Sequence, residues 1–134
     1  MAARSVHHIG IAVDDLDAAI ARYGALFGGS VEHREHVEDQ GVEAASLHVG
    51  SSRVELLAPL GPDTPVGKFL AKRGAGMHHI AFEVDDLAAE LERLRADGVQ
   101  LIDQQPRRGM FGLEVAFVHP ESTGGVLAEF VGNG

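Results

Sequence analysis

The sequence predicts an α+β fold built from two βαβββ modules, and three observations support this prediction. Residues 7–16 (HHIGIAVDDL) and residues 78–87 (HHIAFEVDDL) share seven of ten positions at an offset of 71 in a chain of 134 residues. A half-length repeat indicates two copies of one structural unit. Each repeat begins with strand-like alternation and then changes to helical spacing of its apolar residues. Three further strand-like segments follow each helical segment, which completes the module.

In the first module we expect a strand over residues 4–13. Asp14 or Asp15 then suits a helix N-cap, because its carboxylate can accept hydrogen bonds from free backbone amides. Leu16, Ile20, Tyr23 and Phe27 lie at helical spacing, and Gly28 ends the helix. The remaining strands of this module are expected at residues 30–37, 42–49 and 53–58.

The second module repeats this order, with a strand over residues 77–84 and a cap at Asp85 or Asp86. Its later strands are expected at residues 99–101, 113–118 and 126–131. A short helix over residues 66–73 joins the modules and ends at Gly74. We therefore expect one domain over residues 1–134, with modules at about 4–60 and 76–132.

Composition excludes several classes of function. The net charge of −9 argues against a nucleic-acid partner, which requires a basic face. No apolar run approaches the roughly 20 residues of a membrane helix, and the N-terminus lacks an apolar signal segment, so a cytoplasmic location is expected. The chain has no cysteine, so a metal would need His, Asp or Glu ligands. Such a ligand set favours Mn, Fe, Co, Ni or Zn.

Strand parity singles out one histidine of each repeated pair. Side chains alternate between the two faces of a strand, so His7 shares a face with bulky apolar residues while His8 lies beside Gly10 and Ala12. The same alternation separates His78 from His79. A polar ligand beside small residues suits a concave metal and substrate site. We predict that His8 and His79 are metal ligands, with hydrogen-bonded structural histidines as the alternative.

Two glutamates occupy corresponding positions near the end of each module. Glu55 lies within VELL and Glu129 within VLAEFV. An ionised carboxylate among aliphatic residues costs several kcal/mol unless it is paired or bound to a cation. The predicted metal shell is therefore His8, Glu55, His79 and Glu129. The alternative for both glutamates is an edge position in water.

At this point the chain resembles a known family. The segments that carry the resemblance are HHIGIAVDDLDAAIARY, VELLAPLGPDTPVGKFLAKRG, GMHHIAFEVDDL and PRRGMFGLEVAFVHPESTGGVLAEF. Together they resemble the vicinal oxygen chelate (glyoxalase) superfamily and, within it, the methylmalonyl-CoA epimerases. The resemblance implies a curved eight-stranded sheet around one divalent ion and a homodimeric assembly. It also carries metal ligation over to the same four residues, although some relatives place Gln at the position of Glu55. Cobalt is the metal most often associated with the activity, and Mn, Ni and Zn stay open.

The resemblance further implies epimerisation of (2R)- and (2S)-methylmalonyl-CoA by α-proton abstraction and enolate stabilisation. Inversion of the α-carbon is simplest with two acid–base groups. Glu43, within GVEAASL, matches the catalytic glutamate of the family and is predicted to be one of them. Glu129 is the family's traditional second group, but binding to a cation lowers the basicity of a carboxylate. A held water is the alternative.

A CoA thioester substrate needs positive charge on this acidic chain. Lys68, Lys72 and Arg73 lie on the short connecting helix, and Arg107 and Arg108 lie in a loop that ends in glycine. Both groups are predicted to contact the nucleotide phosphates. The alternative for each residue is solvated surface charge.

Three other functions use related sites. A lactoylglutathione lyase uses a four-ligand metal site of this kind, an extradiol dioxygenase uses iron on two histidines and one carboxylate, and drug-sequestering proteins of the superfamily often lack the metal ligands. The fourth ligand at Glu55 argues against the dioxygenase.

Overall fold

The computed structural model describes residues 3–132. Within it the chain divides into two compact units. The N-terminal unit is His8–His78, and the C-terminal unit is residues 79–132 together with residues 3–7. The expectation of a single domain over residues 1–134 stays a prediction, and its first and last two residues lie outside the described part of the chain.

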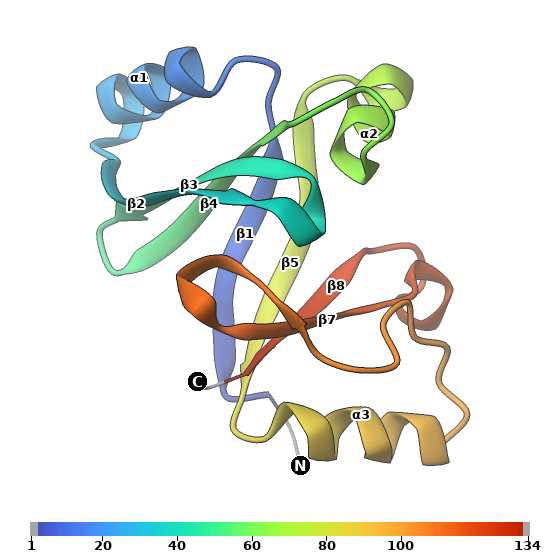
Figure 1. Ribbon diagram of the computed structural model, residues 1–134. Coiled ribbons are helices and arrows are strands. Elements are labelled where there is room, and N and C mark those ends of the chain that lie inside the picture. The colour runs from blue at the N-terminus through green and yellow to red at the C-terminus, as the bar shows by residue number, and fades with distance from the viewer. Residues whose placement is uncertain (1–2, 133–134) are drawn as a thin grey trace. The chain divides into compact units, whose positions relative to one another are not determined.

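The N-terminal unit contains the first βαβββ module and the connecting helix (Figure 1). Its elements are β1 (Ser5–Ala12, of which residues 8–12 belong to this unit), α1 (Leu16–Phe27), β2 (Ser30–Val37), the 3-10 turn η1 (Glu38–Gln40), β3 (Val42–Val49), β4 (Ser52–Pro59) and α2 (Pro65–Arg73). The predicted strands and both predicted helices of this half are confirmed, with ends that match or shift by one residue.

Local chemistry sets the ends of α1. The Asp15 carboxylate accepts a hydrogen bond from the Ala18 amide at 3.0 Å, so the second aspartate of the pair is the N-cap. Gly28 closes the helix with φ of 70°, a left-handed conformation that glycine adopts without strain. The buried face of α1 packs on one face of the sheet, in a core formed by Val13, Leu16, Ala19, Ala45, Leu47 and Leu56.

Register in this unit decides which residues share a face. β3 and β4 pair antiparallel without interruption, with Ser46 opposite Glu55 and Ala45 opposite Leu56. β1 pairs parallel with β4, with Gly10 opposite Glu55. Since Ala45 and Leu56 belong to the core under α1, Ser46 and Glu55 lie on the face away from this helix.

The C-terminal unit contains the second module. Its elements are the start of β1, β5 (Gly76–Val84, from residue 79), α3 (Leu87–Ala96), β6 (Arg107–Arg108), the 3-10 turns η2 (Met110–Gly112) and η3 (Pro120–Thr123), β7 (Glu114–Val118) and β8 (Ala128–Gly132). Asp86 caps α3 by accepting from the Ala89 amide at 3.0 Å, as Asp15 does in the other module. Leu87 and Leu91 of α3 pack against Val84, Ala116 and Ala128.

One predicted strand is wrong. Residues 99–101 form no ladder: Leu101 makes a single bridge to Val118, and the strand beside β7 is instead β6, where Arg107 pairs with Val115. Leu101 is only 7% exposed and belongs to the core under α3. Its apolar character therefore reflects side-chain burial, and the chain leaves the sheet after one bridge.

The strands form an eight-stranded sheet in the order β2-β3-β4-β1-β5-β8-β7-β6, which confirms the predicted strand number and α+β class. The start of β1 lies beside the end of β5, where the Arg4 amide donates to the Glu83 carbonyl at 2.8 Å. None of the described helices has both the length and the apolar composition needed to cross a bilayer.

A polar cluster lies on the N-terminal unit's face that carries Glu55. The carboxylate of Glu32 accepts hydrogen bonds from Arg53 Nε at 3.0 Å and from Ser46 Oγ at 3.1 Å, and it lies 2.9 Å from His48 Nε2. The Arg53 guanidinium is the main cause that lowers the pKa of Glu32 from 4.5 to about 2, against the opposing effect of burial. His48 and Ser46 lower the pKa further. This cluster fixes the edge strand β2 to β3 and β4.

Replacing Glu32 by Gln should lower the free energy of unfolding by about 1 kcal/mol at pH 7, because the charged acceptor of Arg53 is lost at a partly exposed site. Because the folded pKa is lowered, the unfolded chain takes up the Glu32 proton first as pH falls below about 4.5. The stabilisation is therefore full above that pH and is lost as pH falls toward 2. Urea unfolding of both proteins over this pH range measures the difference.

The matched control is Glu121→Gln, which removes the same charge from an exposed residue of η3. It should leave the free energy of unfolding nearly unchanged. A Glu32→Gln difference that stays constant from pH 7 to pH 3 would contradict the assignment of the low pKa to this cluster.

Candidate metal centre

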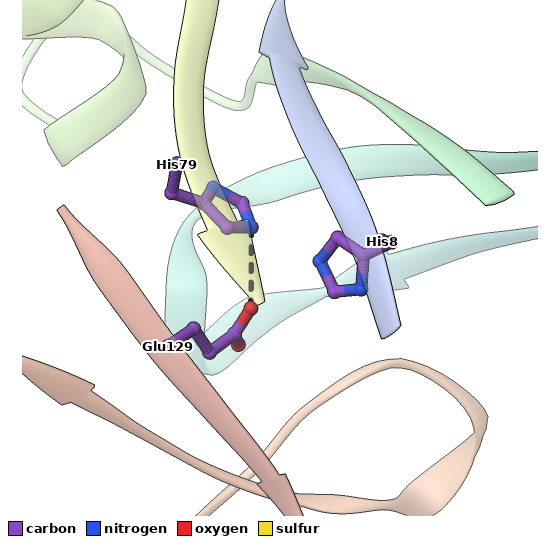
Figure 2. Close-up of side chains that lie close together, drawn as sticks. All are labelled: His8, His79 and Glu129. Atoms are coloured by element: carbon purple, nitrogen blue, oxygen red, sulfur yellow. Dashed lines mark ion pairs between the residues drawn. The ribbon is translucent and has the colours of Figure 1, made fainter. Parts of the chain in front are cut away.

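The C-terminal unit buries an imidazole–carboxylate pair on the sheet face away from α3. Glu129 of β8 lies opposite Ala81 of β5, and His79 is two residues before Ala81 on the same face. His79 Nε2 is 3.1 Å from Glu129 Oε1, and the dashed line in Figure 2 marks this ion pair. His79 is 5% exposed and Glu129 is 3% exposed, so both groups are removed from water.

Phe117 of β7 completes the surroundings of this pair. It lies opposite Glu129 in the β7–β8 ladder, and its ring meets the His79 imidazole edge-on with centroids 5.5 Å apart. Phe117 itself is 8% exposed. The aromatic wall holds the imidazole plane and excludes water from one side of the pair.

The N-terminal unit repeats the arrangement. His8 of β1 and Glu55 of β4 lie on the face away from α1, with His8 Nε2 3.5 Å from Glu55 Oε2. Their exposures are 4% and 6%. Gly10 and Ser46, the cross-strand neighbours of Glu55, are small, so the carboxylate lies beside little side-chain volume.

The spacing of both pairs fits metal ligands. Two donors each about 2.1 Å from one ion, at angles of 90° to 109°, are about 3.0 to 3.4 Å apart. The observed separation of 3.1 Å falls within this range and that of 3.5 Å lies just beyond it, and 3.5 Å is long for a hydrogen bond between such groups. A buried carboxylate in each unit costs several kcal/mol without a compensating cation. The donor set of imidazoles and carboxylates therefore fits a divalent ion.

The neighbouring histidines behave differently. His78 is only partly buried and stacks edge-on against Phe69 of α2, with ring centroids 5.0 Å apart. His7 is exposed. Both belong to the opposite strand parity from the buried histidines, as predicted.

Glu43, the predicted base, lies on the other face of the N-terminal sheet. In β3 it shares its face with Ala45, which packs under α1. Its carboxylate accepts from Arg34 Nε at 3.0 Å, and Arg34 also donates to Asp17 of α1 at 2.6 Å. These contacts raise the pKa of Arg34, with Asp17 the main cause. The structure thus pairs Glu55 with His8 and does not bring Glu43 to them.

The basic residues predicted to contact the CoA phosphates differ in their exposure to solvent. Lys68, Lys72 and Arg73 are exposed on α2, and the Arg73 guanidinium lies 5.8 Å from the Phe69 ring centroid. Arg108 is also exposed. Arg107 is partly buried, and its Nε lies 3.1 Å from the Asp103 carboxylate.

Sequence reasoning missed two residues around these groups. Phe117 was assigned only to a strand, although its parity with Val115 and its place opposite the strand of Glu129 point to the ligand face. Asp103 gave no usable signal, because its contacts with Arg107 and with the Phe117 amide depend on how the loop folds back on β7.

Comparisons with known proteins agree with this architecture. Residues 7–117 match the Glyoxalase/Bleomycin resistance protein/Dioxygenase superfamily model. The chain is 38% identical over 125 residues to the mitochondrial methylmalonyl-CoA epimerase of Homo sapiens, across 92% of this chain and 71% of that protein.

Two solved structures are similar over nearly the whole chain. One is methylmalonyl-CoA epimerase from Mycobacterium tuberculosis, with a TM-score of 0.95 and 40% identity over 98% of this chain and 89% of that chain. The other is a methylmalonyl-CoA epimerase in complex with methylmalonyl-CoA and NH4+, with a TM-score of 0.94 and 42% identity over 98% of this chain and 95% of that chain. The fold, the repeated buried pairs and these likenesses lead to one conclusion: the chain belongs to the glyoxalase/bleomycin resistance protein/dioxygenase superfamily and, within it, to the methylmalonyl-CoA epimerases.

Proposed function

We propose that this protein is an epimerase that interconverts (2R)- and (2S)-methylmalonyl-CoA by removing and returning the α-proton. The observation that carries the proposal is the buried histidine–glutamate pair that recurs in both modules. Family membership supports the substrate, because a relative 42% identical to this chain is described in complex with methylmalonyl-CoA.

The two pairs are proposed to combine in one metal site. His8, His79 and Glu129 are buried residues of metal-ligand type and would be three of the ligands, with Glu55 as the fourth. Two carboxylates would balance the charge of a divalent ion. Cobalt is our proposal for that ion, with Mn, Ni and Zn open, because histidine and carboxylate donors suit all four.

The bound ion would act as a Lewis acid that polarises the thioester carbonyl and so favours loss of the α-proton. The chain's own residues supply the setting for that step. His79 is held by Phe117, and burial of all four ligands keeps water from competing with substrate oxygens. A substrate fixed at this face would present its α-carbon to the carboxylate oxygens of the same face.

The candidates for proton transfer are chosen by the face of the sheet on which each carboxylate lies. Glu129 lies on the ligand face and stays our candidate for one proton-transfer group through its second carboxylate oxygen. Glu43 was predicted to be the other, but its ion pair with Arg34 directs it toward α1. A water held at the ligand face is therefore the better candidate for the second group.

Two further expectations complete the proposal. The exposed basic residues Lys68, Lys72 and Arg73 on α2, together with Arg108, suit the CoA phosphates. Assembly as a homodimer, which the family resemblance supports, and a cytoplasmic location also stay proposals.

Replacing His79 by Ala should lower bound divalent metal by a factor of about ten or more, because one of four ligands is lost. His78→Ala is the matched control, since the two residues are neighbours on opposite faces of β5, and it should retain full metal content. Metal analysis of the purified proteins and the metal-induced rise in melting temperature are the measurements. Equal metal content in both variants would exclude His79 as a ligand.

The wild-type protein should exchange the α-proton of methylmalonyl-CoA with solvent deuterium, and exhaustive chelation should abolish this exchange until a divalent ion is restored. The same preparation should show no activity with methylglyoxal and glutathione. Proton NMR of the substrate measures exchange. Activity only with methylglyoxal and glutathione would replace this proposal with a lactoylglutathione lyase.

In the same assay, Glu43→Gln should retain exchange within about threefold, because the side chain lies on the α1 face and loses only a contact with Arg34. Glu129→Gln should lose both metal and exchange. Loss of exchange by Glu43→Gln with full metal content would return Glu43 to the mechanism as a base.

A further inference from the structure

Arg107 is a positive charge on the ligand-bearing face of the C-terminal unit. It lies opposite Val115 in the β6–β7 ladder, and Val115 shares its face with Phe117, which lies opposite Glu129. Arg107 therefore faces the same side as the proposed ligands of this unit. Arg108, the next residue, has the opposite parity and is exposed.

The Arg107 side chain lies against Asp103. Its Nε lies 3.1 Å from Asp103 Oδ1, while Asp103 Oδ2 accepts a hydrogen bond from the Phe117 amide at 2.9 Å. The Asp103 carboxylate thus contacts both the Arg107 guanidinium and β7, the strand that carries Phe117.

The guanidinium is also close to a proposed metal ligand. Its central carbon lies 6.0 Å from the centroid of Phe117, and the same ring lies 5.5 Å from His79. A single aromatic ring therefore separates this cation from the imidazole. Arg107 is thus a partly buried cation on the face that carries the proposed ligands of this unit.

The proposed substrate carries a carboxylate on its reacting α-carbon, whereas the CoA phosphates lie at the far end of the pantetheine arm. A planar guanidinium binds a carboxylate with two parallel hydrogen bonds. We propose that Arg107 recognises the carboxylate of the malonyl group, and does not contact the CoA phosphates, so that it selects 2-carboxyacyl thioesters over neutral acyl thioesters. This inference rests on the proposed function for the identity of the substrate.

The test compares two substrates that differ in this charge. Arg107→Gln should lower kcat/KM for α-proton exchange of methylmalonyl-CoA on the order of 100-fold, the loss expected when one partner of a desolvated charge pair is removed. Exchange of 2-methylacetoacetyl-CoA, in which a neutral acetyl group replaces the carboxylate, should change by less than about threefold. Arg107→Lys keeps the positive charge but cannot form two parallel hydrogen bonds. Its kcat/KM for methylmalonyl-CoA should therefore lie between those of wild type and Arg107→Gln.

Arg22→Gln is the matched control, because it removes the same charge from an exposed residue of α1, and it should leave both substrates unaffected. Equal losses on both substrates with Arg107→Gln would show a purely structural role and overturn the proposal, as would no loss on either. If loss of affinity for free CoA accompanied the variant, phosphate contact would replace carboxylate recognition.

Binding separates this inference from the proposed function. Calorimetry with metal-loaded protein and malonate should show binding by wild type and Arg22→Gln, and loss of binding by Arg107→Gln. If wild type binds malonate through Arg107 but does not exchange methylmalonyl-CoA, the proposed function fails and the carboxylate site stands. If exchange proceeds while Arg107→Gln behaves as wild type in both assays, the carboxylate site fails alone.

Discussion

Burial of a carboxylate beside an imidazole is the constraint on which the rest of this structure depends. Each module places one glutamate and one histidine on a sheet face where they are almost completely removed from water. A charged carboxylate in such a position is stable only with a compensating charge. This costly arrangement recurs in both modules, at donor spacings of 3.1 and 3.5 Å, and it is the observation behind the proposed divalent ion.

In each unit the two faces of the sheet have different roles, one in folding and the other in the proposed function. One face packs its apolar residues against α1 or α3 and provides the core. The other carries the ligand pairs, the Glu32 cluster and Arg107. The alternation of side chains along a strand makes this division strict, so that adjacent residues have different roles: His78 stacks on Phe69 while His79 faces Glu129. The same alternation places Arg107 and Arg108 on opposite faces, and it places Glu43 and Arg34 on the same face.

Features that depend on local chemistry or on the repeat could be predicted from the sequence. Asp15 and Asp86 cap helices because each precedes a helical stripe, and strand parity placed His8 and His79 on the face opposite His7 and His78. Features that depend on tertiary packing could not. Residues 99–101 look like a strand because Leu101 is buried, yet burial does not require a ladder. Parity grouped Glu43 with Ala45, but only the packing of α1 shows which face that group occupies. The Asp103 contacts join residues that become neighbours only when the loop folds.

The central claim is that His8, Glu55, His79 and Glu129 bind one divalent ion. Anomalous X-ray diffraction from crystals of the metal-loaded protein, collected at the absorption edge of the bound metal, tests it most directly. The account predicts one anomalous peak per chain, about 2.0 to 2.2 Å from a donor atom of each of these four side chains. A peak bound by the residues of one module alone, or bound elsewhere in the chain, would contradict it.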